Sequence, residues 1–148
     1  MNTTIERCEL ASDLNISRIL TGLWQIGDME KDDNHLDYNS KADSMLPYIE
    51  AGFTTFDMAD HYGSAEDIVG LFRRQHNPEK TVQLLTKWVP KPGITTREDV
   101  QVAVKRSMER MQVEQLDLLQ FHAWNYADPN WLDCLFWLQE LKEQGLIR

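Results

Sequence analysis

The sequence has few of the residues on which several protein classes depend. Its 148 residues include only two cysteines, Cys8 and Cys134, which lie far apart and form no Cys-x-x-Cys pair. This excludes a disulfide scaffold and a cysteine-rich zinc site. Apolar runs are much shorter than the roughly 20 residues of a membrane span, and the first residues lack the apolar segment of a signal peptide. We therefore expect a cytoplasmic protein with no membrane partner.

Positive charge is also scarce. Fifteen Lys and Arg stand against 24 Asp and Glu, a formal net charge of −9, which provides no electrostatic footprint for nucleic acid. The chain is 42% apolar and carries five Trp, five Phe and four Tyr, which excludes a disordered tail. The length corresponds to one domain with its own hydrophobic core.

Two phosphate-binding signatures are missing. Residues 22–27 have the glycine spacing of a P-loop, but Asp28-Met29 replaces the Lys-Ser/Thr that would meet phosphate. No Gly-x-Gly-x-x-Gly follows a predicted strand, so the dinucleotide fingerprint is absent. The four histidines form no ligand pair at helical spacing, and we expect no metal site.

Strand-like and helical patterns alternate along the chain. We predict a first strand within residues 16–26, ending near 22–24, with residues 7–10 pairing to it as a small hairpin across Ser12-Asp13. The acidic stretch 28–34 is interpreted as a loop. Further strands are predicted at 53–57, 81–86 and 116–121, and residues 146–148 resemble the opening of a fifth.

Apolar residues at helical spacing predict four helices. Their stripes span residues 42–49, 65–72, 100–111 and 131–141. Thr95 with Glu98 three residues later predicts a capping box for the third helix. In the fourth, the aromatic cluster of Trp131, Phe136 and Trp137 is interpreted as core, with a partner-binding face as the alternative.

The spacing of the predicted strands defines a repeating unit. Strand centres near residues 54, 83, 118 and 147 are 29, 35 and 29 residues apart, the period of a βα unit with a right-handed crossover. An open doubly wound sheet would be complete in about 150 residues, whereas a (β/α)8 barrel typically needs roughly 250. Length favours the open sheet, but the missing glycine fingerprint removes its best support.

Polar residues end the predicted strands. Asp57, Lys87 and His122 each follow a separate strand, and in a barrel such positions converge on one face. Tyr62 lies five residues after Asp57, in a strand-to-helix turn that can return its phenol to the strand end. A phenol, with an ordinary pKa near about 10, donates a proton at neutral pH only if a nearby cation lowers that pKa. Lys87 would supply the cation and Asp57 would hold it; the alternative for Tyr62 is an aromatic packed over a turn.

These residues also form recognisable motifs. Residues 56–63, Phe-Asp-Met-Ala-Asp-His-Tyr-Gly, resemble the Asp-x-x-x-x-Tyr-Gly signature of aldo-keto reductases. Residues 86–88 resemble the lysine strand of that family, and residues 118–122 resemble its histidine strand. Order and spacing match across nearly the whole chain.

The resemblance implies a fold and an activity. The fold is α/β, the N-terminal half of a (β/α)8 TIM barrel, with four βα units preceded by a short N-terminal hairpin. Residues 1–148 would form one domain, truncated at the start of the fifth strand. The activity that it implies is NADPH-dependent reduction of an aldehyde or ketone, a small-molecule carbonyl substrate. The hydride must come from a cofactor because no side chain carries one, and the resemblance implies that this cofactor is NADP(H).

The resemblance also assigns roles to residues. Tyr62 is the general acid, Lys87 lowers its pKa, Asp57 supports Lys87, and His122 orients the carbonyl oxygen. The nicotinamide end of the cofactor would lie near Gly22, Leu23, Trp24 and Asp57. The substrate pocket would be lined by Trp24, Trp88 and Trp124.

A half barrel lacks part of the family's site. The family binds the adenosine phosphates and most of the nicotinamide with residues after strands five to eight, which we expect to be absent here. Open edges at strands one and four predict self-association. The alternative function is a non-catalytic truncated barrel that acts as a binding or regulatory module or as an inactive fragment.

Overall fold

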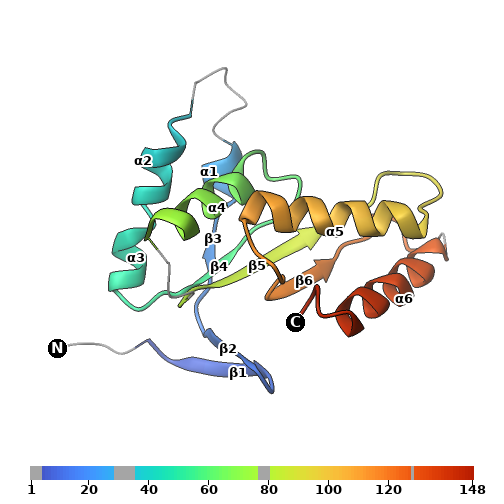
Figure 1. Ribbon diagram of the computed structural model, residues 1–148, viewed down its shortest axis with the longest axis horizontal. Coiled ribbons are helices and arrows are strands. Elements are labelled where there is room, and N and C mark those ends of the chain that lie inside the picture. The colour runs from blue at the N-terminus through green and yellow to red at the C-terminus, as the bar shows by residue number, and fades with distance from the viewer. Residues whose placement is uncertain (1–4, 29–35, 77–80, 128) are drawn as a thin grey trace.

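The computed structural model describes residues 5–28, 36–76, 81–127 and 129–148. At its centre is a four-stranded sheet whose order, β3-β4-β5-β6, follows the chain, and every pairing is parallel (Figure 1). The strands are β3 (Thr21–Gly22), β4 (Thr55–Asp57), β5 (Gln83–Trp88) and β6 (Leu118–Phe121). This is the α/β arrangement of half a barrel, as predicted.

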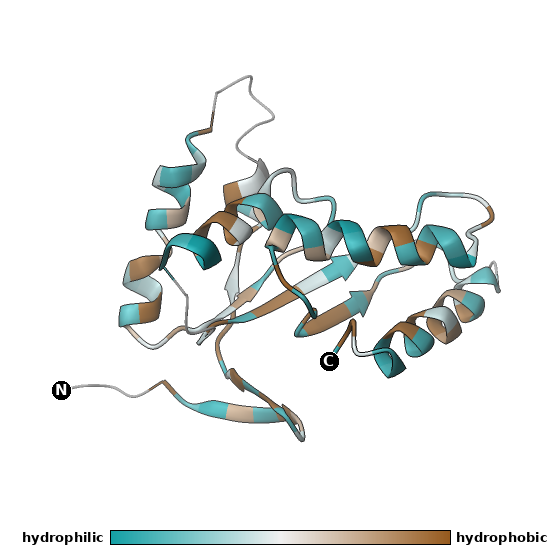
Figure 2. Cartoon of the chain, viewed as in Figure 1, coloured by the Kyte–Doolittle hydropathy of each residue, from teal (hydrophilic) through white to brown (hydrophobic). Residues whose placement is uncertain are grey.

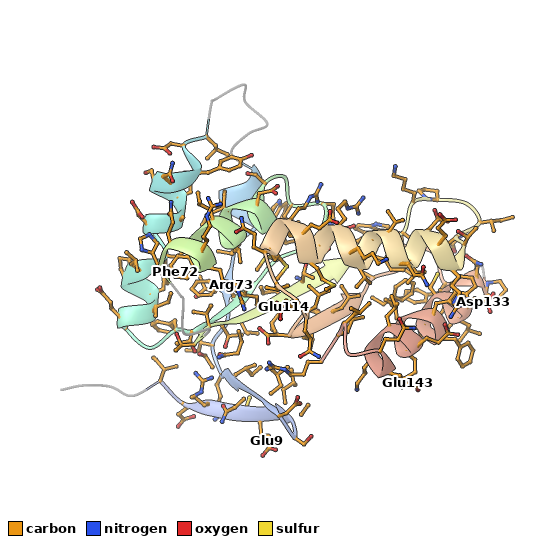
Figure 3. All side chains as sticks on the ribbon, viewed as in Figure 1. Glu9, Phe72, Arg73, Glu114, Asp133 and Glu143 are labelled. Atoms are coloured by element: carbon orange, nitrogen blue, oxygen red, sulfur yellow. The ribbon has the colours of Figure 1, made fainter. Side chains whose placement is uncertain are left out.

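Helices join the parallel strands, and the three long ones, α4 to α6, each bury an apolar stripe. They are α1 (Trp24–Asp28), α2 (Tyr38–Asp43), α3 (Leu46–Glu50), α4 (Ala65–His76), α5 (Arg97–Met111) and α6 (Asn130–Glu143). Figure 2 shows α4 and α5 alternating between hydrophilic and hydrophobic stretches, as expected of helices with one face in the core. Phe72 of α4, labelled in Figure 3, packs against Phe56 of β4 with ring centroids 6.5 Å apart.

A separate antiparallel hairpin precedes the sheet, as predicted. It consists of β1 (Arg7–Ala11) and β2 (Leu14–Ser17). The Arg7 guanidinium donates to Thr54 Oγ1 at 2.6 Å and to Gln83 Oε1 at 2.9 Å. The hairpin therefore lies at the amino ends of β4 and β5, and Glu9 on β1 is far from α4 and α5 (Figure 3). The carboxyl ends of the strands remain accessible on the opposite side.

The prediction of one strand within residues 16–26 was wrong. Strand β2 ends at Ser17, whose amide donates to Thr55 Oγ1 at 2.8 Å, and β3 contains only two residues. The Leu23 amide then donates to the Asp57 carbonyl at 2.9 Å, after which α1 begins. Apolar composition alone did not separate the hairpin, the parallel strand and the helix. The predicted loop at 28–34 lies outside the described residues, apart from Asp28 at the end of α1.

Two helix predictions also needed correction. The single helix expected across 42–49 is two short helices, because Pro47 has no amide hydrogen to continue the ladder from α2. The capping box of α5 uses Thr96 and Asp99, one residue later than predicted. The Thr95 amide is instead bound by Asn130 Oδ1 at 3.0 Å.

Residues 146–148 run beside the start of the fourth βα unit. Leu116 forms a parallel bridge with Ile147, its amide donates to the Leu146 carbonyl at 3.0 Å, and the Arg148 amide donates to the Leu116 carbonyl at 2.8 Å. This pairing is the one expected for the opening of a fifth parallel strand.

Candidate active site at the carboxyl ends of the strands

The register of the sheet brings the polar strand ends together. Asp57 pairs with Leu85, and Lys87 lies two residues further along the same strand, where side chains point to the same face. Lys87 in turn pairs with Gln120 of β6. Three neighbouring strands therefore present polar side chains at one point of the sheet face.

Lys87 is held by β4 through its ammonium group. Its Nζ donates to Asp57 Oδ2 at 2.6 Å and to the Met58 carbonyl oxygen at 2.9 Å. Both charged side chains are partly buried, so the pair is less screened by water than a surface ion pair. The flexible lysine side chain is therefore fixed in one position.

Gln120 is part of the same cluster, and the sequence interpretation missed it. Its Nε2 donates to Asp57 Oδ1 at 3.0 Å, so both carboxylate oxygens of Asp57 are bound, one by a side chain of β5 and one by a side chain of β6. The available signal was the strand period of two, which places Gln120 on the same face as His122.

Tyr62 lies beside the ammonium group. Lys87 Nζ is 5.3 Å from the centroid of the Tyr62 ring, within the range of a cation–π contact. The Trp24 ring also stacks on the Tyr62 ring, with centroids 6.0 Å apart and an interplanar angle of 26°. The turn that carries Tyr62 is tied to β5, because the Met58 and Asp60 amides donate to the Leu85 and Lys87 carbonyls, each at 2.9 Å.

Gly27 permits α1 to contact this turn. A Cβ atom at position 27 would lie 1.8 Å from the Tyr62 carbonyl oxygen, so no other residue fits without displacing backbone. The sequence interpretation gave Gly27 no role of this kind. Close packing here brings Trp24, on the same short helix, against Tyr62.

His122 continues the ladder beyond β6. Its amide donates to the Trp88 carbonyl at 3.0 Å, and its ring centroid lies 4.6 Å from that of Trp124. Trp24 and Trp124 are 58% and 73% exposed, as expected for side chains that border an open pocket. Trp88 differs from the expectation: it is 5% exposed and packs in the hydrophobic core against Phe121, because side chains alternate along β5 and Lys87 takes the other face.

The residues expected near a nicotinamide ring border open space. A Cβ at Gly22 would meet nothing within 4 Å, so a flat group can approach this backbone. Leu23 is buried and offers only its main chain, whereas Trp24 is exposed. These features fit the ring of a nicotinamide cofactor beside Asp57.

Across the described ranges, no group of three or more His, Cys, Asp or Glu side chains is placed to hold a metal ion. Within the same ranges, no helix is both long and apolar enough to cross a membrane.

Comparisons with known proteins identify the family of this chain. The model of the aldo/keto reductase family matches residues 18–148. An uncharacterised oxidoreductase, YqkF, of Bacillus subtilis is 32% identical over 155 residues, covering 93% of this chain and 44% of that protein. The 6-dehydroglucose reductase of Agrobacterium fabrum is 30% identical over 133 residues, covering 80% of this chain and 43% of that protein.

A solved structure shares the fold. An aldo-keto reductase of Bacillus halodurans in its holo form superimposes with a TM-score of 0.77 at 25% identity, covering 97% of this chain and 48% of that one. The chain spans about half the length of the curated relatives that it matches. With a family match over most of its length, the chain belongs to the aldo/keto reductase family.

Proposed function

We propose that this chain supplies the proton-transfer residues of an NADPH-dependent reductase that converts an aldehyde or ketone to an alcohol. The observation that carries the proposal is the position of Lys87, whose ammonium group is bound to Asp57 and lies 5.3 Å from the Tyr62 ring. A phenol beside a fixed cation, at the open end of a half barrel, is suited to donate a proton to a developing alkoxide.

NADPH, when bound, supplies the hydride that reduces the carbonyl carbon. The Gly22 backbone, Leu23 and Trp24, together with Asp57, would hold the nicotinamide end. Arg106 and Arg110, the arginines nearest the Tyr62 turn, are already bound to Asp60 and Glu66. We therefore expect the cofactor phosphates to be bound by another part of a complete barrel.

The protein's own contribution is proton transfer and charge stabilisation. As the carbonyl carbon gains hydride, its oxygen gains negative charge, and the Tyr62 hydroxyl donates its proton to that oxygen. The phenolate left on Tyr62 is stabilised by Lys87, whose position is fixed by Asp57. The products are an alcohol, the oxidised cofactor NADP+ and a tyrosinate that must regain a proton from solvent.

His122 and two tryptophans would position the substrate. An imidazole N–H from His122 is a second donor for the carbonyl oxygen. Trp24 and Trp124 offer exposed aromatic surfaces on which the carbon skeleton of an aldehyde or ketone can pack.

Replacing Tyr62 tests the proposal. Tyr62→Phe keeps the ring and removes the proton, so we expect the reductase rate to fall by about 100-fold or more while NADPH affinity stays unchanged. Tyr48→Phe, an exposed tyrosine on α3, is the matched control and should leave the rate unaltered. A Tyr62→Phe protein with the parent rate would contradict the proposal.

A binding measurement separates this function from a non-catalytic module. Titration with NADPH, followed by tryptophan fluorescence, should quench Trp24, which lies beside the expected nicotinamide position. Absence of quenching at high NADPH concentration would favour a binding or regulatory role for the half barrel.

A further inference from the structure

Asp60 is a buried acid in the turn between Asp57 and Tyr62, and proton transfer makes no use of it. Its side chain is only 6% exposed. One carboxylate oxygen, Oδ2, accepts from Arg106 at 3.2 Å, and the other, Oδ1, is 3.1 Å from His61 Nδ1. Aspartates are almost never so buried unless they are paired, so this pairing requires an explanation.

A second arginine secures the same turn. Arg110 lies one helical turn after Arg106 on α5, so the two side chains share a face of that helix. Its guanidinium donates to the Asp60 carbonyl oxygen at 3.1 Å and to Glu66 Oε2 at 3.4 Å. Glu66, which is 1% exposed, also accepts from Thr86 of β5 at 2.7 Å. The turn is thus bound to α5 as well as to the sheet.

The contacts continue from Asp60 to the proposed general acid. His61, held through Nδ1 by Asp60, presents its ring edge-on to Tyr62 with centroids 4.9 Å apart. Trp24 also contacts Tyr62, and its ring stacks on the tyrosine ring. Arg106, Asp60, His61, Tyr62 and Trp24 therefore form one continuous series of contacts.

We propose that Asp60 and Arg106 are positioning residues, which fix the turn and, through His61, set the orientation of the Tyr62 ring. The Asp60 side chain is buried but that of Arg106 is 41% exposed, so desolvation of the carboxylate offsets an attraction that water also screens, and stability alone is a weak reason for this pair. Orientation is a better reason, since a displacement of about 1 Å can cost about 100-fold in rate. The role in catalysis rests on the proposed function, whereas the geometric role does not.

Fluorine NMR measures the geometric role directly. All tryptophans are replaced by 5-fluorotryptophan, and the resonance of Trp24 is assigned as the one that disappears in Trp24→Phe. The Tyr62→Leu variant then gives the chemical shift of Trp24 when no tyrosine ring is stacked on it. Asp60→Asn and Arg106→Met should each move the Trp24 resonance at least halfway toward that reference position. The double variant should move it no further than either single variant, because both act through one pair.

Arg97→Met is the matched control. Arg97 also lies on α5 and forms an ion pair, with Glu140 of α6, away from the Tyr62 turn. It should lower stability without moving the Trp24 resonance. Arg106→Lys, which keeps the charge, should restore the parent resonance at least in part.

A Trp24 resonance that stays at the parent position in Arg106→Met, while the melting temperature falls, would overturn the proposal in favour of a purely structural pair. An equal movement in Arg97→Met would overturn it as well. If Asp60→Asn does not fold, Arg106→Met and Arg106→Lys test the proposal by the same measurement, the movement of the Trp24 resonance.

The chemical shift of Trp24 can be measured without turnover, so the NMR test can be interpreted even if the chain proves to have no reductase activity. Where turnover is measured, Asp60→Asn and Arg106→Met should lower kcat by about tenfold with KM nearly unchanged, since they alter the geometry of proton transfer rather than substrate binding.

Discussion

Asp57 binds two other polar side chains at the centre of the candidate site. Each of its carboxylate oxygens accepts a hydrogen bond from a different strand, Oδ2 from Lys87 on β5 and Oδ1 from Gln120 on β6. A carboxylate bound on both sides cannot rotate freely, and the ammonium group that it holds is fixed with it. The position of the cation beside Tyr62 therefore depends on two strands in addition to β4.

Gln120→Leu tests this dependence at the scale of one residue. The change removes the donor to Asp57 Oδ1 and keeps the side chain close to its original size. A hydrogen bond to a charged group is worth about 1.5 kcal/mol, so we expect kcat to fall by about tenfold with KM unchanged. Gln115→Leu removes an exposed hydrogen bond, to the Gly145 carbonyl, and is the control for reductase assays. An unchanged kcat in Gln120→Leu would show that Lys87 alone orients Asp57.

Among the helices and strands, the sequence predicted those that carry a long apolar pattern. Helices α4, α5 and α6 bury one stripe each, and their apolar spacing was sufficient to locate them. The β3–α1 boundary was missed because a two-residue strand carries no period and is defined by pairing with β4. For the aromatic cluster on α6, the core interpretation holds for Trp137, which packs against the core, but not for Phe136, which is 68% exposed.

The capping box of α5 gives a prediction with a pH dependence. Hydrogen bonds from the Thr96 side chain, and then from its backbone amide, lower the pKa of Asp99 below the ordinary value of 3.8. A lowered pKa in the folded state means that ionised Asp99 stabilises α5 above pH 3.8, and that this stabilisation is lost as the pH falls toward the folded-state pKa. Asp99→Asn should therefore lower the melting temperature at pH 7 and have a smaller effect at about pH 3.

Glu98→Gln is the matched control, because Glu98 is in the same first helical turn but does not bind the cap. It should show a smaller loss at pH 7, owing only to the helix dipole. Thr96→Ala should cost about 1 kcal/mol in the free energy of unfolding, measured by urea denaturation. Equal effects for Glu98→Gln and Asp99→Asn would contradict the assignment of the cap to Asp99.

The packing of α4 on α5 depends on a residue without a side chain. A Cβ at Gly70 would lie 2.0 Å from the Arg110 carbonyl oxygen, so the two helix backbones approach closely there. Helix propensity favours Ala over Gly by about 1 kcal/mol, but overpacking of this kind costs about 1–3 kcal/mol and should dominate. Gly70→Ala should therefore destabilise the protein in urea denaturation. A gain in stability would mean that the helices separate at little cost.

At the scale of the whole molecule, the βα repeat explains how much of the site could be predicted. Asp57, Lys87 and His122 were placed together because the carboxyl ends of parallel strands share one edge, whatever their exact register. Gln120 and the Asp60–Arg106 pair were not found, because they depend on register and on how α5 lies across the turn. Trp88 was assigned to the pocket although the alternation along β5 places it in the core.

The edges of the half barrel offer surfaces on which a second chain can pack. Strands β3 and β6 are the two edges of the described sheet, with a single bridge from Ile147 beside Leu116. Unpaired strand edges are templates for association with another chain. On α6, Leu132, Leu135 and Phe136 are all exposed, which adds apolar surface to the helix that follows β6 in the chain.

We expect two copies of the chain to associate through these surfaces. Sedimentation velocity at increasing concentration should show a species with twice the mass of one chain, and Phe136→Glu should shift it toward the monomer because a carboxylate at an apolar contact must be desolvated. Tyr48→Glu places the same charge on α3, at another exposed aromatic position, and should leave the mass distribution unchanged. A monomer at every concentration, with the secondary structure intact, would show that the edges are protected without a partner and would leave the half barrel as a stable unit.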